Sequence, residues 1–436
     1  MRTAEHFTSA DPFRVNYTDA DPGSIFPSQG ENGPVAASYN SWYGDMTLPF
    51  WKSMANLGVP TNFDPDSGNA FGTFNTPSTV NRTTGRRSYA ATTYYAYNAH
   101  RPNFVVLTGA QATKINFQNT TSGSKNKNLV ASGVSFVHKS QTHTVKVKKE
   151  VILSAGAFQS PPSTRAQRDR QFHNPSEDHL ILTTLYELKP GSSTQGFDDL
   201  RNNATFAAAA AAQYNATHDG ILSYPVGSIL SFINLDFMAS SAEISRMRAR
   251  LDREIASENI TPLQEISYDI QKGWLKKRVG LIEVGMYPGY VGAVAPKANT
   301  SYISISLFLE HPFSRGNIHV NTSDPLIAPV IDPKYFSKSI ASVIASRQEP
   351  PPEVTSNLAI ADYVKAHVSS SHHPIGTVAM APKELGGVVN GHLKVYGTAN
   401  IRVVDASVIP LHIGAHIQRT VYGIAEKAAT MIKRGL

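Results

Sequence analysis

Hydrophobic and polar positions alternate in three runs between residues 103 and 158. The runs NFVVLTGAQATKINF, ASGVSFVHK and HTVKVKKEVILSAGAF are rich in β-branched residues and are separated by polar turns. Alternation with a period of two is typical of strands that bury one face. The pattern predicts that a β-sheet begins at Asn103.

The third run ends in small residues, with Gly156 and Ala157 after the apolar stretch VILSA. In open α/β sheets, ligands bind beyond the carboxyl ends of the strands, and small residues let the backbone approach a ligand closely. We therefore interpret Gly156 and Ala157 as candidate cofactor-binding residues. An ordinary strand followed by a turn fits these residues equally well.

A helical patch occurs near Leu48 to Leu57, an Ala-rich stretch of high helix propensity runs from Phe206 to Ala212, and an amphipathic, charged helix is predicted around Ile244 to Ser257. The C-terminus combines a strand and turn, NIRVVDASVIP, with a helix over AHIQRTVYGIAEKAATMIKRGL. Apolar residues recur along that helix at helical spacing: Ile417, Val421, Ile424, Ala428 and Met431 or Ile432. We place His416 in the first turn, where free amides favour an anion or an electron-rich ring.

A chain of 436 residues is longer than the roughly 250 to 300 residues of a single core, which indicates two lobes. Residues 1–100 are rich in Gly, Pro, Asn and Ser and are predicted to be loops packed on the rest. Residues 179–335 mix strands and helices, as in an α+β lobe. The Pro-rich stretch 337–356 is interpreted as a linker or irregular loop.

The composition removes several classes of function. The absence of cysteine excludes disulfides, zinc-thiolate sites, iron-sulfur clusters and cysteine nucleophiles. The net charge of +7 is scattered in short clusters, so nucleic-acid binding is not expected; it could recruit an anionic cofactor or form a solvated surface. No apolar run reaches the roughly 20 residues of a membrane-spanning helix, and no signal peptide is recognised. The compartment stays open, although Asn-x-Ser/Thr sequons would suit a secreted protein: Asn16, Asn81, Asn119, Asn203, Asn215, Asn259, Asn299 and Asn321.

Longer motifs carry a specific resemblance. The stretch 371–429, beginning SHHPIGTVAMAP and ending AHIQRTVYGIAEKAA, resembles the C-terminal pattern of the glucose-methanol-choline (GMC) family of FAD-dependent oxidoreductases. EVILSAGAFQSP is similar to that family's second signature, and the blocks 85–115 and 311–336 are similar to its intervening segments. The resemblance implies an α/β FAD-binding lobe of incomplete Rossmann-like type and an α+β substrate-binding lobe with an antiparallel sheet.

The resemblance also assigns boundaries. It implies a loop-rich segment, 1–98, that contributes to the substrate lobe and covers FAD. Residues 99–178 would form the first part of the FAD-binding lobe, residues 179–370 the substrate-binding lobe, and residues 371–436 the second part of the FAD-binding lobe with the catalytic histidines.

The same resemblance assigns chemistry to two histidines. His373, in the HPIGT motif, would remove the proton of an alcohol while hydride leaves the carbinol carbon for FAD, and His416 would hydrogen-bond the oxygen; the two roles could be reversed. The electron acceptor would be O2 or a quinone-like compound. Further residues would line the FAD: Ala112 at the adenine, and Asp405, Ala406, Ile417 and Gln418 along the pyrophosphate and isoalloxazine. Sugar, aryl-alcohol, choline-like and polyketide substrates all stay open.

The sequence departs from the family in four places. No Gly-x-Gly-x-x-Gly motif occurs, the segment after Pro161 is shortened, a block is missing between Phe336 and His372, and Asn390 replaces an acidic residue. A truncated, spliced or degenerate gene product explains all four, so an inactive remnant, a non-redox cyclase or an accessory protein is the alternative. His412 and His416 are four residues apart, as two metal ligands can be, but the sequence offers no third ligand. A serine hydrolase is disfavoured because the sequence contains no G-x-S-x-G elbow.

Overall fold

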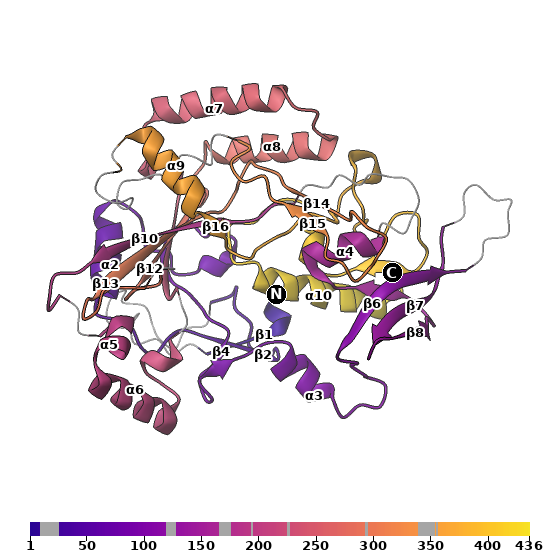
Figure 1. The fold of residues 1–436 in the computed structure, drawn as a ribbon, viewed down its shortest axis with the longest axis horizontal. Coiled ribbons are helices and arrows are strands. Elements are labelled where there is room, and N and C mark those ends of the chain that lie inside the picture. The colour runs from indigo at the N-terminus through magenta and orange to yellow at the C-terminus, as the bar shows by residue number, and fades with distance from the viewer. Residues whose placement is uncertain are drawn as a thin grey trace.

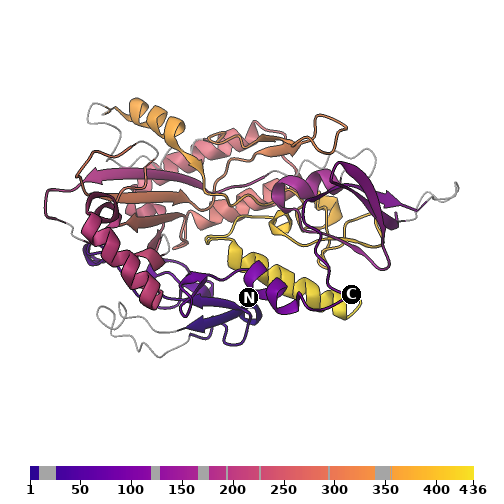
Figure 2. The same cartoon turned by 60° about the horizontal axis from the view of Figure 1, so that its bottom comes forward.

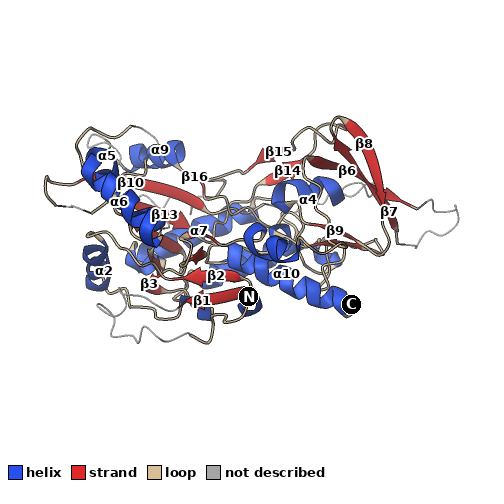
Figure 3. Cartoon of the chain, turned by 90° about the horizontal axis from the view of Figure 1, so that it is seen from below, coloured by secondary structure: helices blue, strands red, loops and turns tan. Residues whose placement is uncertain are grey.

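The computed structural model describes residues 1–8, 26–118, 128–164, 176–192, 195–224, 227–292, 295–338, 354 and 356–436. The described residues form two lobes with separate hydrophobic cores (Figure 1). Seen from below in Figure 3, a large antiparallel sheet lies at one end of the molecule and a three-stranded meander at the other.

The first lobe is built on a six-stranded antiparallel sheet. Its order is β16 (Ser369–Ser370), β10 (Leu180–Glu187), β13 (Tyr302–Leu309), β12 (Ile282–Tyr287), β11 (Ile229–Ile233) and β3 (Gly72–Asn75). Every residue of β11 and β12 is buried. These strands are therefore covered on both faces, which explains why they are more continuously apolar than a half-exposed strand.

Three helices share the core of this sheet: α2 (Thr47–Asn56), α7 (Ser241–Ala256) and α8 (Pro262–Trp274). Reciprocal capping boxes begin the two longer ones, Ser240 with Glu243 in α7 and Thr261 with Gln264 in α8. The remaining helices of this region are α5 (Phe197–Asn202), α6 (Ala204–Thr217) and α9 (Asn357–His367). The helices predicted near Leu48 to Leu57, over the Ala-rich stretch and around Ile244 to Ser257 are confirmed as α2, α6 and α7. The predicted C-terminal helix is confirmed as α10.

The second lobe contains a parallel pair of strands, β9 (Val151–Leu153) with β17 (Ile401–Val403). Helix α4 (Gly156–Thr164) follows β9, and a short 3-10 helix, Ala406–Val408, follows β17. The meander β6 (Ala110–Phe117), β7 (Ala131–His138) and β8 (Gln141–Lys146) flanks them. The prediction that a strand begins at Asn103 is wrong: β6 begins at Ala110, because residues 103–109 pair with no described strand.

Helix α10 (Gln418–Lys433) connects the second lobe to the N-terminus, which lies beside it in Figure 2. Arg419 in its first turn donates to the Glu5 carboxylate at 2.7 Å and to the Ser28 carbonyl at 2.7 Å, and it pairs with Asp66. Glu5 belongs to β1 (Glu5–Thr8), which pairs in parallel with β2 (Val35–Ser38). The N-terminal segment is thus tied directly to the last helix.

Smaller elements complete the described chain: 3-10 turns at Arg2–Ala4, Pro65–Ser67, Ile221–Ser223, Leu235–Phe237 and Lys383–Leu385, a π turn Ala91–Tyr95, α3 (Ala96–Asn98), and the hairpins β4 (Val80–Asn81) with β5 (Arg86–Arg87) and β14 (Asn317–His319) with β15 (Val330–Asp332). Most of the predicted linker 337–356, and the shortened segment up to residue 175, lie outside the described residues. Among the described helices, none has the length and apolar character needed to cross a membrane.

Candidate active site

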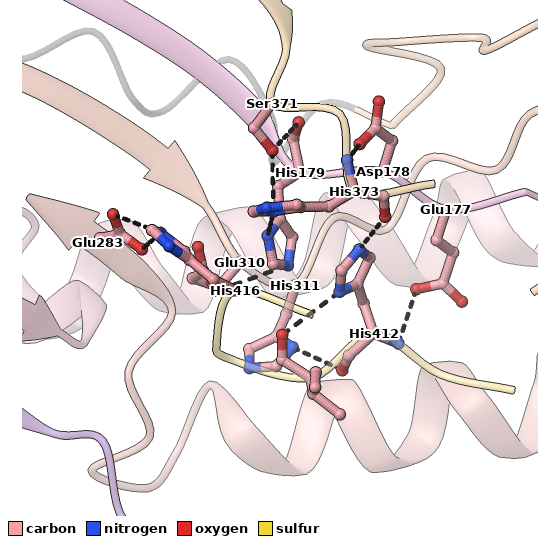
Figure 4. A network of polar contacts seen from close by, with 11 residues as sticks. Glu177, Asp178, His179, Glu283, Glu310, His311, Ser371, His373, His412 and His416 are labelled. Atoms are coloured by element: carbon pink, nitrogen blue, oxygen red, sulfur yellow. Dashed lines mark hydrogen bonds and ion pairs between the residues drawn. The ribbon is translucent and has the colours of Figure 1, made fainter. Parts of the chain in front are cut away.

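The main chain of His373 is fixed on both sides, as Figure 4 shows. Its N–H donates to the Asp178 carboxylate at 2.9 Å, and its carbonyl accepts from His412 Nε2 at 3.0 Å. Asp178 immediately precedes the buried His179 and strand β10, so a residue just before this strand of the antiparallel sheet holds the HPIGT motif in place.

The His373 ring has one occupied and one open side. Its Nδ1 lies 3.0 Å from His179 Nδ1 and 3.2 Å from Ser371 Oγ, whereas no described residue hydrogen-bonds its Nε2. Burial, reinforced by the neighbouring His416 and His372, lowers the His373 pKa to about 4. At neutral pH this ring is therefore uncharged and can accept a proton.

The His416 ring lies with its centroid 5.3 Å from that of His373. Its Nε2 contacts both carboxylate oxygens of the buried Glu283 on β12, at 3.2 and 3.1 Å. The Glu283 charge raises the His416 pKa above its usual value, against the effect of burial. The side chain remains 46% exposed. Two histidines of the C-terminal segment thus lie together in opposite electrostatic settings.

The predicted place of His416 in the first turn of the last helix is wrong. Helix α10 begins at Gln418, with Ile417 as its N-cap. His416 therefore lies two residues before the helix, in an irregular segment that begins near Pro410. The ion pair with Glu283, on the sheet of the other lobe, holds the ring there instead of a helical backbone.

A buried group of histidines lies beneath His373. The His179 and His412 rings are 3.6 Å apart between centroids, and His311 Nδ1 donates to the His412 carbonyl at 3.1 Å. Burial lowers the pKa of His412 to about 3 and that of His311 to about 4. The Nε2 atoms of His412 and His416 face a carbonyl and a carboxylate, respectively. No group of three metal-ligating side chains is found among the described residues.

Sequence reasoning missed three residues of this site: His179, Glu283 and Glu310. All three are completely buried. Glu283 and Glu310 could have been noticed, because a carboxylate inside or directly after an apolar strand, as in LIEVGMY and SLFLEHP, is rarely buried without a partner. His179 stands where the sequence rejoins the family pattern, but no local feature indicates that it meets His373.

The predicted cofactor residues gather in part at the carboxyl ends of β9 and β17. The Asp405 carboxylate accepts from the Gly156 amide at 2.9 Å, the Ser160 hydroxyl at 2.5 Å and the Ser407 amide at 2.9 Å. Asp405 therefore joins the two strand ends, and its carboxylate is occupied by protein donors. Gly156 has φ +75°, and the space beyond its Cα is open, as a close approach by a ligand requires.

The remaining predicted residues differ in position. Ala406 opens the 3-10 helix after β17, and the Ala157 carbonyl accepts from Thr377 Oγ1 at 2.8 Å. Ile417 and Gln418 begin α10, where no side chain caps the first amides, so the positive helix end is available to an anionic group. Ala112 lies exposed on β6 in the meander, and no described contact joins it to the histidines.

Comparison with known proteins agrees with this geometry. Models of the GMC oxidoreductase family match residues 38–164 and 339–425. A dehydrogenase of Armillaria gallica is 32% identical over 96% of this chain and 71% of its own length. A GMC oxidoreductase family protein of Malassezia sympodialis is 30% identical over 99% of this chain and 72% of its own length.

Solved structures have the same fold. A fungal aryl-alcohol oxidase superposes with a TM-score of 0.82 at 25% identity, covering 100% of this chain and 78% of its own. An FAD-dependent oxidoreductase of Chaetomium thermophilum gives 0.83 at 23% identity, covering 100% of this chain and 79% of its own. The arrangement is that of a flavoprotein oxidoreductase with a cofactor lobe and a substrate lobe. The chain belongs to the GMC oxidoreductase family, which confirms the predicted family and its cofactor, FAD.

Proposed function

We propose that this chain oxidises the CH–OH group of a small-molecule alcohol, with His373 as the base and His416 as the hydrogen-bond donor to the substrate oxygen. The observation that supports these roles most directly is the difference between the two rings. His373 is buried with a pKa near 4 and an open Nε2, whereas His416 is paired with Glu283 and has a raised pKa. Opposite settings of neighbouring titratable groups are typical of an acid and base pair.

The geometry gives each side chain one task. The alcohol would lie between the two rings, with its hydroxyl hydrogen toward His373 Nε2. Because His416 Nε2 donates to the Glu283 carboxylate, the other ring nitrogen of His416 can donate only when the ring is protonated, a form that its raised pKa favours. That nitrogen would donate to the substrate oxygen, which gains negative charge as the proton leaves. The oxygen would thus lose its proton to one histidine and be stabilised by the other.

The chain's residues fit FAD at the edge between the lobes. The open turn at Gly156 and the Ala406 turn lie at the ends of the parallel strands, where α/β sheets bind nucleotides. The uncapped start of α10 follows β17 along the chain and offers free amides to an anionic group. We propose that Ile417 and Gln418 face the isoalloxazine and pyrophosphate side and that Asp405 acts by fixing these turns. Bound FAD would supply the acceptor for the hydride that leaves the carbinol carbon.

The substrate and the second acceptor are proposed only by class. The similar proteins include a fungal aryl-alcohol oxidase and a glucose oxidase of Aspergillus carbonarius, 27% identical over 92% of this chain. We therefore propose a primary or secondary alcohol as the substrate and O2 or a quinone-like compound as the acceptor. We also propose that the cofactor lobe is an incomplete Rossmann-like fold. Its parallel sheet, β9 with β17, has two strands among the described residues.

The test is the visible spectrum of the purified protein after it has been incubated with FAD and desalted. We expect a retained flavin band that bleaches anaerobically when aryl alcohols or sugars are added. We expect His373→Gln to keep the band and to slow bleaching by about 100-fold or more. A protein that stays colourless would reject this proposal and favour an inactive or non-redox member of the family.

A further inference from the structure

Three buried groups extend away from the open side of His373. His179 Nδ1 lies 3.0 Å from His373 Nδ1, and His179 Nε2 lies 3.5 Å from Glu310 Oε2. The strand register explains this contact. Leu180 pairs with Leu309 between antiparallel β10 and β13, so the residues just outside that pair, His179 and Glu310, meet at the same end of the sheet. Both are completely buried.

The surroundings of His373 Nδ1 indicate which nitrogen carries the hydrogen. The Ser371 hydroxyl donates to the His179 carbonyl at 3.1 Å, so its lone pairs are available to His373 Nδ1 at 3.2 Å. A hydrogen on His373 Nδ1 thus faces two acceptors, Ser371 Oγ and His179 Nδ1. This tautomer leaves His373 Nε2 free as the base, and it places the hydrogen of His179 on Nε2, toward Glu310.

Glu310 is unusual because its carboxyl group has few partners. Neither oxygen makes a hydrogen bond of ordinary geometry with a described residue. Burial, and then the charge of Glu283, raise its pKa well above the usual range, and the Ala415 amide offsets this only in part. An ionised carboxylate without partners is costly inside a protein, so Glu310 is a strong proton acceptor whenever it is ionised, and it is ionised only above its raised pKa.

We infer that His179 and Glu310 are positioning residues that take up, by relay, the proton that His373 removes from the substrate. The relay starts from an ionised Glu310, the form that is present above its raised pKa. His373 Nε2 binds the alcohol proton while its Nδ1 proton passes to His179 Nδ1, and the His179 Nε2 proton passes to the Glu310 carboxylate. One proton leaves the alcohol and one reaches Glu310, so both rings end neutral. This inference rests on the proposed function for the source of the proton.

The neighbouring groups favour this neutral outcome over a charged ring. His179 is surrounded by His373, His412, His311 and His416, and burial with these neighbours lowers its pKa well below the usual value. The stacked His412 ring holds the His179 plane in place. A buried imidazolium is therefore disfavoured at His179 and at His373, whereas a protonated carboxyl group at Glu310 is not.

The first experiment needs no bound FAD. Ring-15N histidine spectra of the protein would report the tautomer of His373, assigned with His373→Gln. At a pH above the raised Glu310 pKa, where Glu310 is ionised, we expect Nδ1 to be protonated and Nε2 unprotonated in the parent protein. In Glu310→Gln, an amide that can donate to His179 Nε2 should shift His373 toward the other tautomer. As a matched control, Glu187→Gln on the exposed end of the same strand as His179 should leave the spectrum unchanged.

Unchanged His373 ring signals in a folded Glu310→Gln variant would overturn the relay. If that variant fails to fold, His179→Gln gives a second comparison, because it removes the same partner from His373 Nδ1. Thermal unfolding of each variant shows which of them are folded.

The second experiment measures flavin reduction by alcohol in the protein loaded with FAD. We expect Glu310→Gln and His179→Gln each to lower the limiting rate by about 100-fold with little change in KM, and the double variant to be no slower than the slower single one. Additive losses would contradict a relay. If the His373 tautomer shifts but no variant or parent reduces flavin, the relay geometry stands and the proposed function fails.

Discussion

Strand β12 of the antiparallel sheet and strand β9 of the parallel pair are buried to very different degrees, although β17, the partner of β9, is fully buried. All six residues of β12 are buried, whereas in β9 Val151 is buried and Ile152 is 45% exposed. Along α10 only Ala428 is fully buried, and Phe158 in α4 is 40% exposed. The first lobe is thus a complete core, and the second presents apolar surface that bound FAD or further structure would cover.

Truncation of a buried side chain should give the largest difference between the two lobes in the free energy of unfolding. We expect Ile282→Ala, at a fully buried position of β12, to lower the free energy of unfolding by about 2–5 kcal/mol because it leaves a cavity. The matched Ile152→Ala in β9 should change it by about 0.5 kcal/mol or less. Urea denaturation measures both. Equal losses would show that β9 is covered in solution and would remove the contrast.

The junction inside the cofactor lobe should be the next most sensitive place. Asp405→Ala removes the common acceptor of Gly156, Ser160 and Ser407, so we expect a loss of about 3 kcal/mol from the buried donors left unpaired. Thermal unfolding together with FAD titration would measure it. Asp405→Asn, which keeps an acceptor oxygen, should lose less; an equal loss would indicate that charge, not hydrogen bonding, is what the junction needs.

FAD itself should stabilise one lobe more than the other. At a free FAD concentration 100 times Kd, we expect a gain of about 2.7 kcal/mol, seen as slower hydrogen exchange in β9, β17 and the start of α10. Exchange in β12 and β13 should change less. Removing FAD by dialysis should reverse the effect. Uniform protection of both lobes would mean that they unfold as a single unit.

The smallest expected effect comes from pH. Because Glu283 raises the pKa of His416 in the folded protein, the pair stabilises the fold below the unfolded histidine pKa, and this contribution is lost as pH rises through the folded value. Parent protein and Glu283→Gln compared by denaturation from pH 6 to 9 should therefore converge toward high pH. The half-exposed ring limits the size of the difference. A constant difference would assign the effect of Glu283 to packing.

Much of the architecture could be predicted from local patterns. Helical spacing of apolar residues located α7 and α10, and alternating runs located β6 to β9, because burial of one face leaves its period in the sequence. The Ala-rich composition located α6. The alternating pattern gave a wrong prediction at residues 103–109, where Phe104 to Leu107 have the composition of a strand but are 41–82% exposed. Strand pairing depends on a partner from elsewhere in the chain, and no local pattern contains that information.

The site was predictable only where motifs carried it. His373 and His416 stand in recognisable motifs, but the side chains that set their protonation come from β10, β12 and β13. Glu283 and His416 are 133 residues apart, and His179 and His373 are 194 apart. Each pair joins a residue in or next to the antiparallel sheet to an irregular segment near the C-terminus, so the tertiary structure, and no local pattern, brings them together. Ala112, assigned to the adenine end of FAD, lies on the meander, and its role stays a prediction.

The link between Gly156 and Asp405 spans 249 residues, and this separation governs how the protein is made. Strand β9 leaves the ribosome long before β17, its parallel partner, has been synthesised, so its edge stays open through most of translation. Contacts so distant in sequence form slowly, and open strand edges promote aggregation. The yield of folded protein should therefore depend on chaperone protection and on translation speed across the middle of the chain.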